Sequence, residues 1–376
     1  MSEFAAGPAG RIERVRALMA ERGYDAIVVR DEANLRWLTG VKGVFDYTFE
    51  FPHAAFITAD QCLFHTDSRY LNSFEENTSA GSPWVYDMDE GTIPGWVAGK
   101  IAANKCRVCA VEDDMQINFY QGIQRGLEDR SVACMLPLMH DDIRKMRAIK
   151  DAEEIELMRH AQSITDAAFQ HMLGYIKPGM TEKQVRNELE NFMFANGADS
   201  LAFGSIVASG PNTANPHAVP SDRVIEKGDF VLMDYGAGYC DYRSDMTRTV
   251  VMGEPTQEQL DLYALVRRAH EECVAAIHPG VEGNDIFKLS KKIIGDAGYG
   301  DYYNHGLGHG VGIDIHELPN FNRSKNIIEV GSVITMEPGV YLPGVGGVRL
   351  EDYGVVTESG YEPFTKTPHD LHVIDC

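Results

Sequence analysis

An internal repeat in the second half of the chain is the feature that most limits its possible folds. Ile176-Lys-Pro-Gly-Met180 recurs as Ile277-His-Pro-Gly-Val281. Further on, Gly228-Asp-Phe-Val-Leu-Met-Asp-Tyr-Gly236 recurs as Gly331-Ser-Val-Ile-Thr-Met-Glu-Pro-Gly339, at nearly the same separation. A structural duplication explains both matches, since loop insertions produce small differences in separation. Chance similarity of short turn motifs is the alternative.

The part of the chain before the repeat alternates between helical and strand patterns. Residues 11–23 have helical periodicity, and residues 25–29, 54–58 and 62–66 are typical of short strands. This alternation predicts an α/β domain. A long amphipathic helix follows the Pro137 region, with Asp151 and Glu154 as an acidic N-terminal cap. We therefore expect two domains, residues 1–138 and 139–376.

Charge and cysteine content exclude several classes of protein. The formal net charge of −22 disfavours nucleic acid and anionic lipid as partners. The chain has no apolar run near the roughly 20 residues that span a bilayer, and no signal-peptide pattern. The seven cysteines do not suggest a disulfide framework, and we expect the Cys106/Cys109 pair to be buried strand thiols. A cytoplasmic protein is the expectation.

The repeat aligns four acidic residues in two pairs. Asp234 and Glu337 occupy equivalent places, each at the end of an apolar strand and close to a glycine turn. A second aligned, β-rich segment pairs Asp245 with Glu351. Acids at equivalent places in two related halves should meet near a local two-fold axis. Desolvation and mutual repulsion oppose their joint ionisation unless a cation compensates. Solvent-facing acids in turns are the alternative.

A glycine-rich segment supplies possible nitrogen ligands. Residues 305–317, His-Gly-Leu-Gly-His-Gly-Val-Gly-Ile-Asp-Ile-His-Glu, contain His305, His309 and His316. The glycines permit close backbone approach to a ligand. The segment holds neither a nucleotide-binding glycine motif nor H-E-x-x-H, and there is no G-x-S-x-G nucleophile turn. Three histidines beside four converging acids indicate a functional site; isolated core histidines are the alternative.

Together these motifs resemble the pita-bread metallopeptidases, in particular the prolidase and aminopeptidase P group. The matching segments, over about residues 140–376, are V-A-S-G-P-N-T-A-N-P-H, G-D-F-V-L-M-D-Y-G-A, S-D-M-T-R-T, H-G-L-G-H-G-V-G-I-D-I-H-E, T-M-E-P-G-V-Y and G-V-R-L-E-D. The first domain resembles the creatinase/prolidase-type N-terminal domain through N-L-R-W-L-T-G and T-D-S-R-Y. The resemblance implies an α/β protein whose C-terminal domain is an internally duplicated α+β pita-bread fold.

The resemblance also implies a set of metal ligands, which are Asp234, Asp245, His309, Glu337 and Glu351. Asp245 and Glu351 would bridge two divalent ions, with Asp234 on one ion and His309 and Glu337 on the other. Four oxygen ligands and one nitrogen favour Mn²⁺, with Co²⁺, Fe²⁺ or Zn²⁺ as substitutes. Because all five ligands are of the required type, metal-free relatives of this fold fit the chain less well.

The activity implied by the resemblance is hydrolysis of the bond between an N-terminal residue and proline in short peptides. A hydroxide bridging the metals would attack the carbonyl, and Glu337 would move a proton to the leaving nitrogen. His217 and His316 resemble substrate-side histidines, and His305 would lie in the proline-side pocket. Arg349 would brace the ligands, although a structural salt bridge is equally consistent. A homodimer is implied, with the first domain serving oligomerisation and cleft closure.

One position departs from the resemblance. Asp241-Tyr-Arg-Ser precedes Asp245, where many relatives carry a small residue and a cysteine. Residues 241, 243 and 245 would share one face of a strand, so Arg243 would either reach the site and alter proline specificity or pair with Asp241. The second interpretation is favoured.

Three alternatives for the function stay open. The compact first domain favours an Xaa-Pro dipeptidase over an aminopeptidase. Another hydrolase or a lyase on the same dinuclear scaffold, acting on a cyclic amidine or ectoine-type substrate, would keep the five ligands and differ in its substrate pocket. A non-catalytic binding module is the third alternative, and a measurement of bound metal discriminates it, because two bound ions per chain would be unexpected for a pure binder.

Overall fold

The protein is described by a computed structural model that covers residues 7–41, 52–78, 81–88, 91–321 and 325–376. It divides into two compact units, Met1–Arg147 and Ala148–Cys376. The division falls later than the expected boundary at residue 138. The reason is that helix α6 (Asp142–Arg147) belongs to the first unit, where Arg147 Nη1 donates to Asn34 Oδ1 at 2.8 Å.

The first unit is a five-stranded mixed sheet with helices around it. The strand order is β4-β3-β2-β1-β5, with β1 antiparallel to β2 and parallel to β5. The strands are β1 (Ala26–Val29), β2 (Ala54–Thr58), β3 (Cys62–His65), β4 (Trp84–Tyr86) and β5 (Cys109–Val111). The helices are α1 (Gly7–Arg22), α2 (Glu32–Thr39), α3 (Leu71–Asn77), α4 (Ile93–Ala103) and α5 (Ile117–Asp129). The expected α/β fold, its first helix and its first three strands are confirmed.

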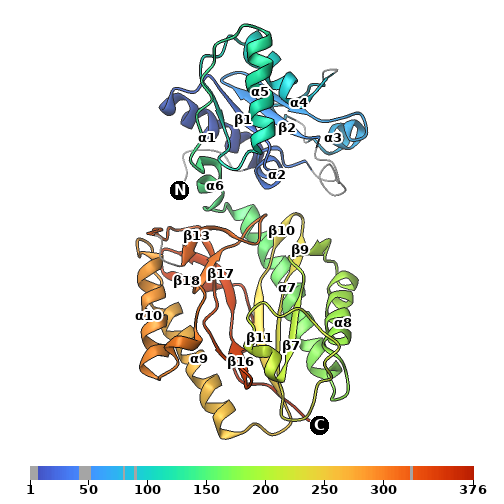
Figure 1. Cartoon of the computed structure of the whole chain (residues 1–376), viewed down its shortest axis with the longest axis vertical. Coiled ribbons are helices and arrows are strands. Elements are labelled where there is room, and N and C mark those ends of the chain that lie inside the picture. Colours follow the sequence, from blue (N-terminus) through green and yellow to red (C-terminus); the bar gives the residue numbers. More distant parts are fainter. Residues whose placement is uncertain (1–6, 42–51, 79–80, 89–90, 322–324) are drawn as a thin grey trace. The chain divides into compact units, whose positions relative to one another are not determined.

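The second unit has one pair of helices on each side of its strands (Figure 1). The helices are α7 (Ala152–Tyr175) and α8 (Glu182–Ala195) on one flank, and α9 (Gln257–Ala275) and α10 (Gly283–Asp296) on the other. A β19-β11-β8-β7 sheet and a β13-β12-β14-β17-β18 sheet form the centre. Their strands are β7 (Ile206–Ser209), β8 (Phe230–Tyr235), β11 (Met246–Met252), β12 (Gly308–Gly310), β13 (Glu317–Phe321), β14 (Val333–Met336), β17 (Asp352–Thr357), β18 (Gly360–Pro363) and β19 (Val373–Ile374).

Smaller sheets complete the second unit. A β10-β9-β6 sheet and a β15-β16 hairpin carry short connections between the central strands. Their strands are β6 (Ser200–Leu201), β9 (Ala237–Tyr239), β10 (Tyr242–Arg243), β15 (Gly339–Leu342) and β16 (Gly346–Arg349). Two 3₁₀ helices, η1 (Gly210–Ala214) and η2 (Gly300–Tyr302), precede the histidine-bearing loops.

Equivalent glycines show that the two halves of this unit share one backbone plan. Gly179 and Gly280 have φ of 94° and 90°, and Gly228 and Gly331 both have φ of 89°. Residues other than glycine rarely adopt this backbone conformation. The first pair also donates its amide protons to carbonyls of the loops before the central strands, at 2.9 and 2.7 Å. The internal duplication expected from the sequence is therefore present in the fold.

Local signals in the sequence correctly mark the start of α7. Asp151 accepts from the amide of Glu154 while the Glu154 side chain accepts from the amide of Asp151, which satisfies two helix-end donors. The buried face of α7 contributes to a core that also contains residues of α8, β7, β8 and β11. A second core forms between α9, α10 and the β15–β16 hairpin. These two cores fix the strands whose ends carry the acidic residues.

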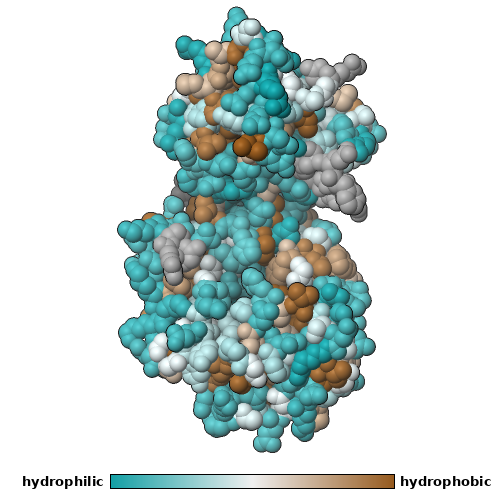
Figure 2. Space-filling model, in the orientation of Figure 1, coloured by the Kyte–Doolittle hydropathy of each residue, from teal (hydrophilic) through white to brown (hydrophobic). Residues whose placement is uncertain are grey.

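All seven cysteines are free thiols. Cys109 lies in β5 and is fully buried, as expected, and Cys106 is buried just before that strand. In the described part of the chain no helix is long and apolar enough to cross a membrane. The visible face of the molecule is mainly hydrophilic, with its hydrophobic residues in small separate patches (Figure 2).

Candidate active site

The four paired acids lie at the ends of central strands in the second unit. Asp234 is near the end of β8, and Glu337 follows β14 directly. Asp245 precedes β11, and Glu351 lies between β16 and β17. The β14–β17 register pairs Met336 with Asp352, so that Glu337 and Glu351 come next to each other. The duplicated framework therefore carries these acids toward one point.

A cavity of about 380 Å³ lies at this point. Its lining contains every candidate metal ligand and catalytic residue named from the sequence, namely His217, Asp234, Asp245, His305, His309, His316, Glu337, Arg349 and Glu351. Phe203, Ile206, Pro216 and Ile315 add an apolar wall. A cavity of this size, with a few convergent polar groups and apolar walls, is typical of a site for a small ligand.

His309 faces the carboxylates through Nε2. Its Nδ1 hydrogen-bonds the Gly310 carbonyl at 2.9 Å, which orients the ring. Nε2 then lies 3.6 Å from Asp245 Oδ2 and 3.5 Å from Glu337 Oε1. One ligand atom each from Asp245, His309 and Glu351 lie within 4.8 Å of one another. Carboxylate oxygens and an imidazole nitrogen at this spacing suit a divalent transition metal.

Burial perturbs the acids of the cavity strongly. Burial raises the pKa of Glu351 and of Asp245 well above the usual range, and the neighbouring carboxylates raise both further. Burial also raises the pKa of Glu337 to about 7, against the opposing effect of Arg349. Asp234 Oδ1 is buried and has no hydrogen-bond partner among the described residues. If these acids were all ionised, their negative charge would exceed what Arg349 neutralises, and a bound cation would compensate it.

Among the described residues that line the cavity, Arg349 is the one arginine or lysine. Its Nη2 donates to Asp234 Oδ2 at 2.6 Å, and its Nη1 donates to the Tyr341 hydroxyl at 2.9 Å. Its Nε donates to Thr247 Oγ1 at 2.9 Å, and Thr247 in turn donates to Glu351 Oε2 at 2.6 Å. Although burial opposes its charge, Tyr341 and Asp234 hold the pKa of Arg349 above its usual range. Arg349 thus connects acids from both halves of the duplication.

The remaining histidines occupy different depths of the cavity. His305 Nε2 hydrogen-bonds the Tyr341 hydroxyl at 2.9 Å, and burial lowers the pKa of His305 to about 3. His217 and His316 are exposed at the surface. The rings of His309 and His316 lie 4.3 Å apart between centroids, so the exposed His316 packs against His309.

Arg243 binds backbone carbonyls of loops that line the cavity. Its Nε donates to Ile313 O at 2.7 Å, and its Nη1 donates to the carbonyls of Leu201 and Ala202. These carbonyls precede Phe203 and Ile315 of the apolar wall. Arg243 therefore braces the loops on which the apolar wall stands.

The sequence analysis did not single out two side chains that link candidate residues of the site. Tyr341 joins His305 to Arg349, and Thr247 joins Arg349 to Glu351. Thr247 lies two residues after Asp245, and this spacing on a strand places both on one face. That spacing was the available signal for Thr247. Tyr341 gives no comparable signal, because its partners come from other segments.

Two family matches span most of the chain. Residues 156–358 match metallopeptidase family M24, and residues 11–149 match the creatinase/prolidase N-terminal domain. The chain belongs to the M24 metallopeptidases, in the two-domain form with a pita-bread catalytic domain, and it is a metal-dependent enzyme.

Individual relatives match over nearly their whole length. An Xaa-Pro dipeptidase of Pyrococcus horikoshii is 42% identical, over 96% of this chain and 98% of the relative. A solved Xaa-Pro dipeptidase from Bacillus anthracis superposes with a TM-score of 0.89 at 36% identity, covering 98% of this chain and all of the other. An X-Pro aminopeptidase from Thermotoga maritima superposes with a TM-score of 0.85 at 31% identity, covering 97% of this chain and all of the other.

Proposed function

We propose that this chain hydrolyses the peptide bond between an N-terminal residue and proline, and that dipeptides are its substrates. One observation carries the proposal: the acids, histidines and arginine singled out from the sequence line one cavity in a member of the M24 family. The full-length similarity to Xaa-Pro dipeptidases supports the bond that is cut.

Five residues would hold two divalent metal ions, and they are Asp234, Asp245, His309, Glu337 and Glu351. The burial of their carboxylates, the unpartnered Asp234 Oδ1 and the orientation of His309 all fit such ions. Bound ions of this kind polarise a substrate carbonyl and bring the pKa of water toward neutrality. The oxygen-rich ligand set favours Mn²⁺ over softer ions.

Glu337 and the residues of the cavity that are not ligands would handle substrate and protons. Glu337, which faces His309 in the cavity, would accept a proton and pass it to the leaving proline nitrogen. His217 and His316, at the exposed side, would hydrogen-bond the substrate carbonyl. The neutral His305, fixed by Tyr341, would border the proline ring. Arg349 would keep Asp234 ionised and in place.

X-Pro aminopeptidase activity is the second candidate, because a solved enzyme with that activity superposes almost as well as the dipeptidases. Turnover of Ala-Pro against Ala-Pro-Ala by Mn²⁺-loaded protein separates the two. We expect Ala-Pro to be cut faster; a preference for Ala-Pro-Ala would assign the aminopeptidase. Cleavage of neither peptide would remove the Xaa-Pro assignment altogether.

We further propose a homodimer in which the first unit serves oligomerisation and cleft closure, and a cytoplasmic location. The seven free thiols support a reducing compartment. Light scattering during gel filtration tests the dimer, since a monomeric mass would contradict it. Cell fractionation tests the compartment.

A further inference from the structure

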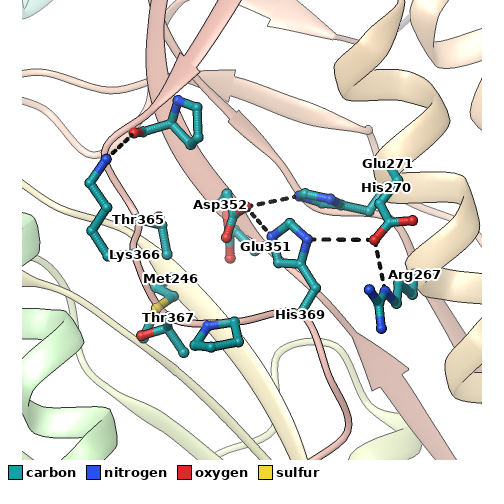
Figure 3. Close-up of polar contacts among 12 residues, drawn as sticks. Met246, Arg267, His270, Glu271, Glu351, Asp352, Thr365, Lys366, Thr367 and His369 are labelled. Carbon is teal, nitrogen blue, oxygen red and sulfur yellow. Dashed lines mark hydrogen bonds and ion pairs between the residues drawn. The ribbon is translucent and has the colours of Figure 1, made fainter.

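A second cluster of metal-ligand side chains lies in the second unit, and it is separate from the residues that line the candidate active site. His270 comes from α9, Asp352 is the first residue of β17, and His369 lies in the irregular segment between β18 and β19. The fold brings these three distant segments together (Figure 3). One ligand atom from each residue lies within 4.8 Å of the other two.

Both imidazoles direct Nε2 toward the same carboxylate oxygen. His369 Nε2 hydrogen-bonds Asp352 Oδ2 at 2.6 Å, and His270 Nε2 lies 3.6 Å from that oxygen. The two rings stand edge to face, with centroids 4.7 Å apart and an angle of 71° between their planes. Asp352 Oδ2 is therefore the shared corner of a compact N, N, O arrangement.

His270 has a buried side chain whose polar atoms lack partners. Its relative exposure is 1%, and neither ring nitrogen has a hydrogen-bond partner within the described ranges of the chain. The 3.6 Å separation from Asp352 Oδ2 is too long for a good hydrogen bond. Buried polar groups are nearly always hydrogen-bonded, so a bound ligand would explain the two ring nitrogens of His270. Burial lowers the pKa of His270 to about 4, so its ring is neutral and keeps a lone pair.

The two carboxylate oxygens of Asp352 have different neighbours. Arg248 Nη2 donates to Oδ1 at 2.7 Å and also donates to the Thr367 carbonyl, so the guanidinium is fixed in place. Oδ2 thus faces the two imidazoles. The positive charge of Arg248 rests on the other oxygen.

A further carboxylate lies behind His369. Glu271 Oε1 is 3.8 Å from His369 Nδ1, and Arg267 Nε donates to this same oxygen at 2.7 Å. Figure 3 shows the chain of contacts from Arg267 through Glu271 and His369 to Asp352. Histidines that bind metals usually direct their second nitrogen at such a carboxylate, which fixes the ring orientation. Glu271 lies on the side where such an orienting group stands, although 3.8 Å is longer than a hydrogen bond.

We propose that His270 Nε2, Asp352 Oδ2 and His369 Nε2 bind one divalent transition-metal ion of the Zn²⁺, Co²⁺ or Ni²⁺ class. Two imidazoles and one carboxylate suit these ions better than Mg²⁺, Ca²⁺ or Mn²⁺. Three protein ligands leave a fourth position for water, which can approach along the 28%-exposed side chain of His369.

Binding requires a small local movement. Tetrahedral bonds of about 2.0–2.1 Å place ligand atoms roughly 3.3 Å apart, so His369 Nε2 must retreat from its 2.6 Å contact with Asp352 as the ion replaces the proton between them. His369 lies in an irregular segment and not in a strand, which permits this shift. His270 needs almost no movement, because its Nε2 is already 3.6 Å from the shared oxygen.

The ion would fasten the C-terminal segment to α9 and to the start of β17. Asp352 directly follows Glu351, a candidate ligand of the active-site metals. This proposal goes beyond the proposed function, because the second ion would stabilise the strand next to an active-site residue. A ligand that binds the native state alone stabilises it by mass action, so Zn²⁺ should raise the melting temperature through this site.

Metal stoichiometry of the full chain tests the proposal. The protein is stripped with chelator, loaded with excess Zn²⁺, gel-filtered and measured for metal by mass spectrometry. The wild type is expected to retain one equivalent more than His369→Asn. His278→Asn, the same change at an exposed histidine of this unit, serves as the control and is expected to equal the wild type. Equal metal content in the wild type and His369→Asn, or the same loss in His278→Asn, would overturn the site.

A second variant guards against a folding defect. His270→Gln is expected to lose the same single equivalent, and the double variant of His270 and His369 is expected to lose one equivalent in total. Loss of two equivalents by the double variant would contradict a shared ion. Replacing Zn²⁺ by Mn²⁺ is expected to abolish the difference between the wild type and His369→Asn, and a persisting difference would contradict the proposed class of metal. The difference of one equivalent does not depend on whether the active site is filled or cleaves Xaa-Pro peptides, so the two proposals fail separately.

Discussion

The substitution Arg349→Met tests how the acids of the active site are balanced. Arg349 is buried, and its Nη2 contacts Asp234 Oδ2 at 2.6 Å. Methionine preserves much of the apolar volume but removes the charge and the donors to Tyr341 and Thr247. Breaking one side of a buried ion pair typically costs about 3–5 kcal/mol. For a domain of this size, about 2–4 °C of melting temperature corresponds to each kcal/mol.

We therefore expect metal-free Arg349→Met to melt about 6–20 °C below the wild type in differential scanning calorimetry. Mn²⁺ should reduce this deficit, because the ions supply positive charge beside Asp234. The exposed change Arg268→Met is the control, since exposed ion pairs contribute about 0–1 kcal/mol. A metal-free Arg349→Met protein that melts with the control would refute the reasoning.

Three further predictions concern the same site. Glu351→Ala is expected to lose both metals and all turnover while circular dichroism stays native; two retained metals, found by metal analysis, would disprove its role. Because burial raises the folded-state pKa of Glu337 from 4.5 to about 7, its contribution to metal-free stability is present below pH 4.5 and lost as pH rises through 7. The melting-temperature gain from Mn²⁺ should therefore grow across that window, and a gain that stays flat with pH contradicts this. Tyr341→Phe removes the hydroxyl between His305 and Arg349 and should lower kcat/KM for Ala-Pro about tenfold, or about 1.4 kcal/mol, with metal content unchanged. The exposed Tyr302→Phe is the control and should match the wild type. An unchanged kcat/KM in Tyr341→Phe would show that the hydroxyl has no role in turnover.

The duplicated strands explain why so much of the site was predictable. Asp234 and Glu337, like Asp245 and Glu351, follow the same apolar patterns in both halves, and strand ends transmit that symmetry to the acids. The glycines before the central strands also reveal the repeat, because few residues other than glycine adopt the left-handed backbone that both positions require. The positions of the four acids at the strand ends could therefore be predicted from local sequence.

What the sequence did not reveal depends on contacts between distant segments. Tyr341 gains its role from His305 and Arg349, which only the folded β15–β16 hairpin brings together. The cluster of His270, Asp352 and His369 has no ligand spacing in the sequence, because its members lie on a helix, a strand and an irregular segment. The end of the first unit at residue 147 likewise depends on the hydrogen bond between Arg147 and Asn34.

Anomalous X-ray diffraction at the manganese absorption edge, on crystals of Mn²⁺-loaded protein, tests the central claim most directly. Two strong peaks are expected among Asp234, Asp245, His309, Glu337 and Glu351, each within bonding distance of its carboxylate oxygens. An empty cavity in metal-saturated crystals, or peaks bound only by other residues, would contradict a dinuclear hydrolase site.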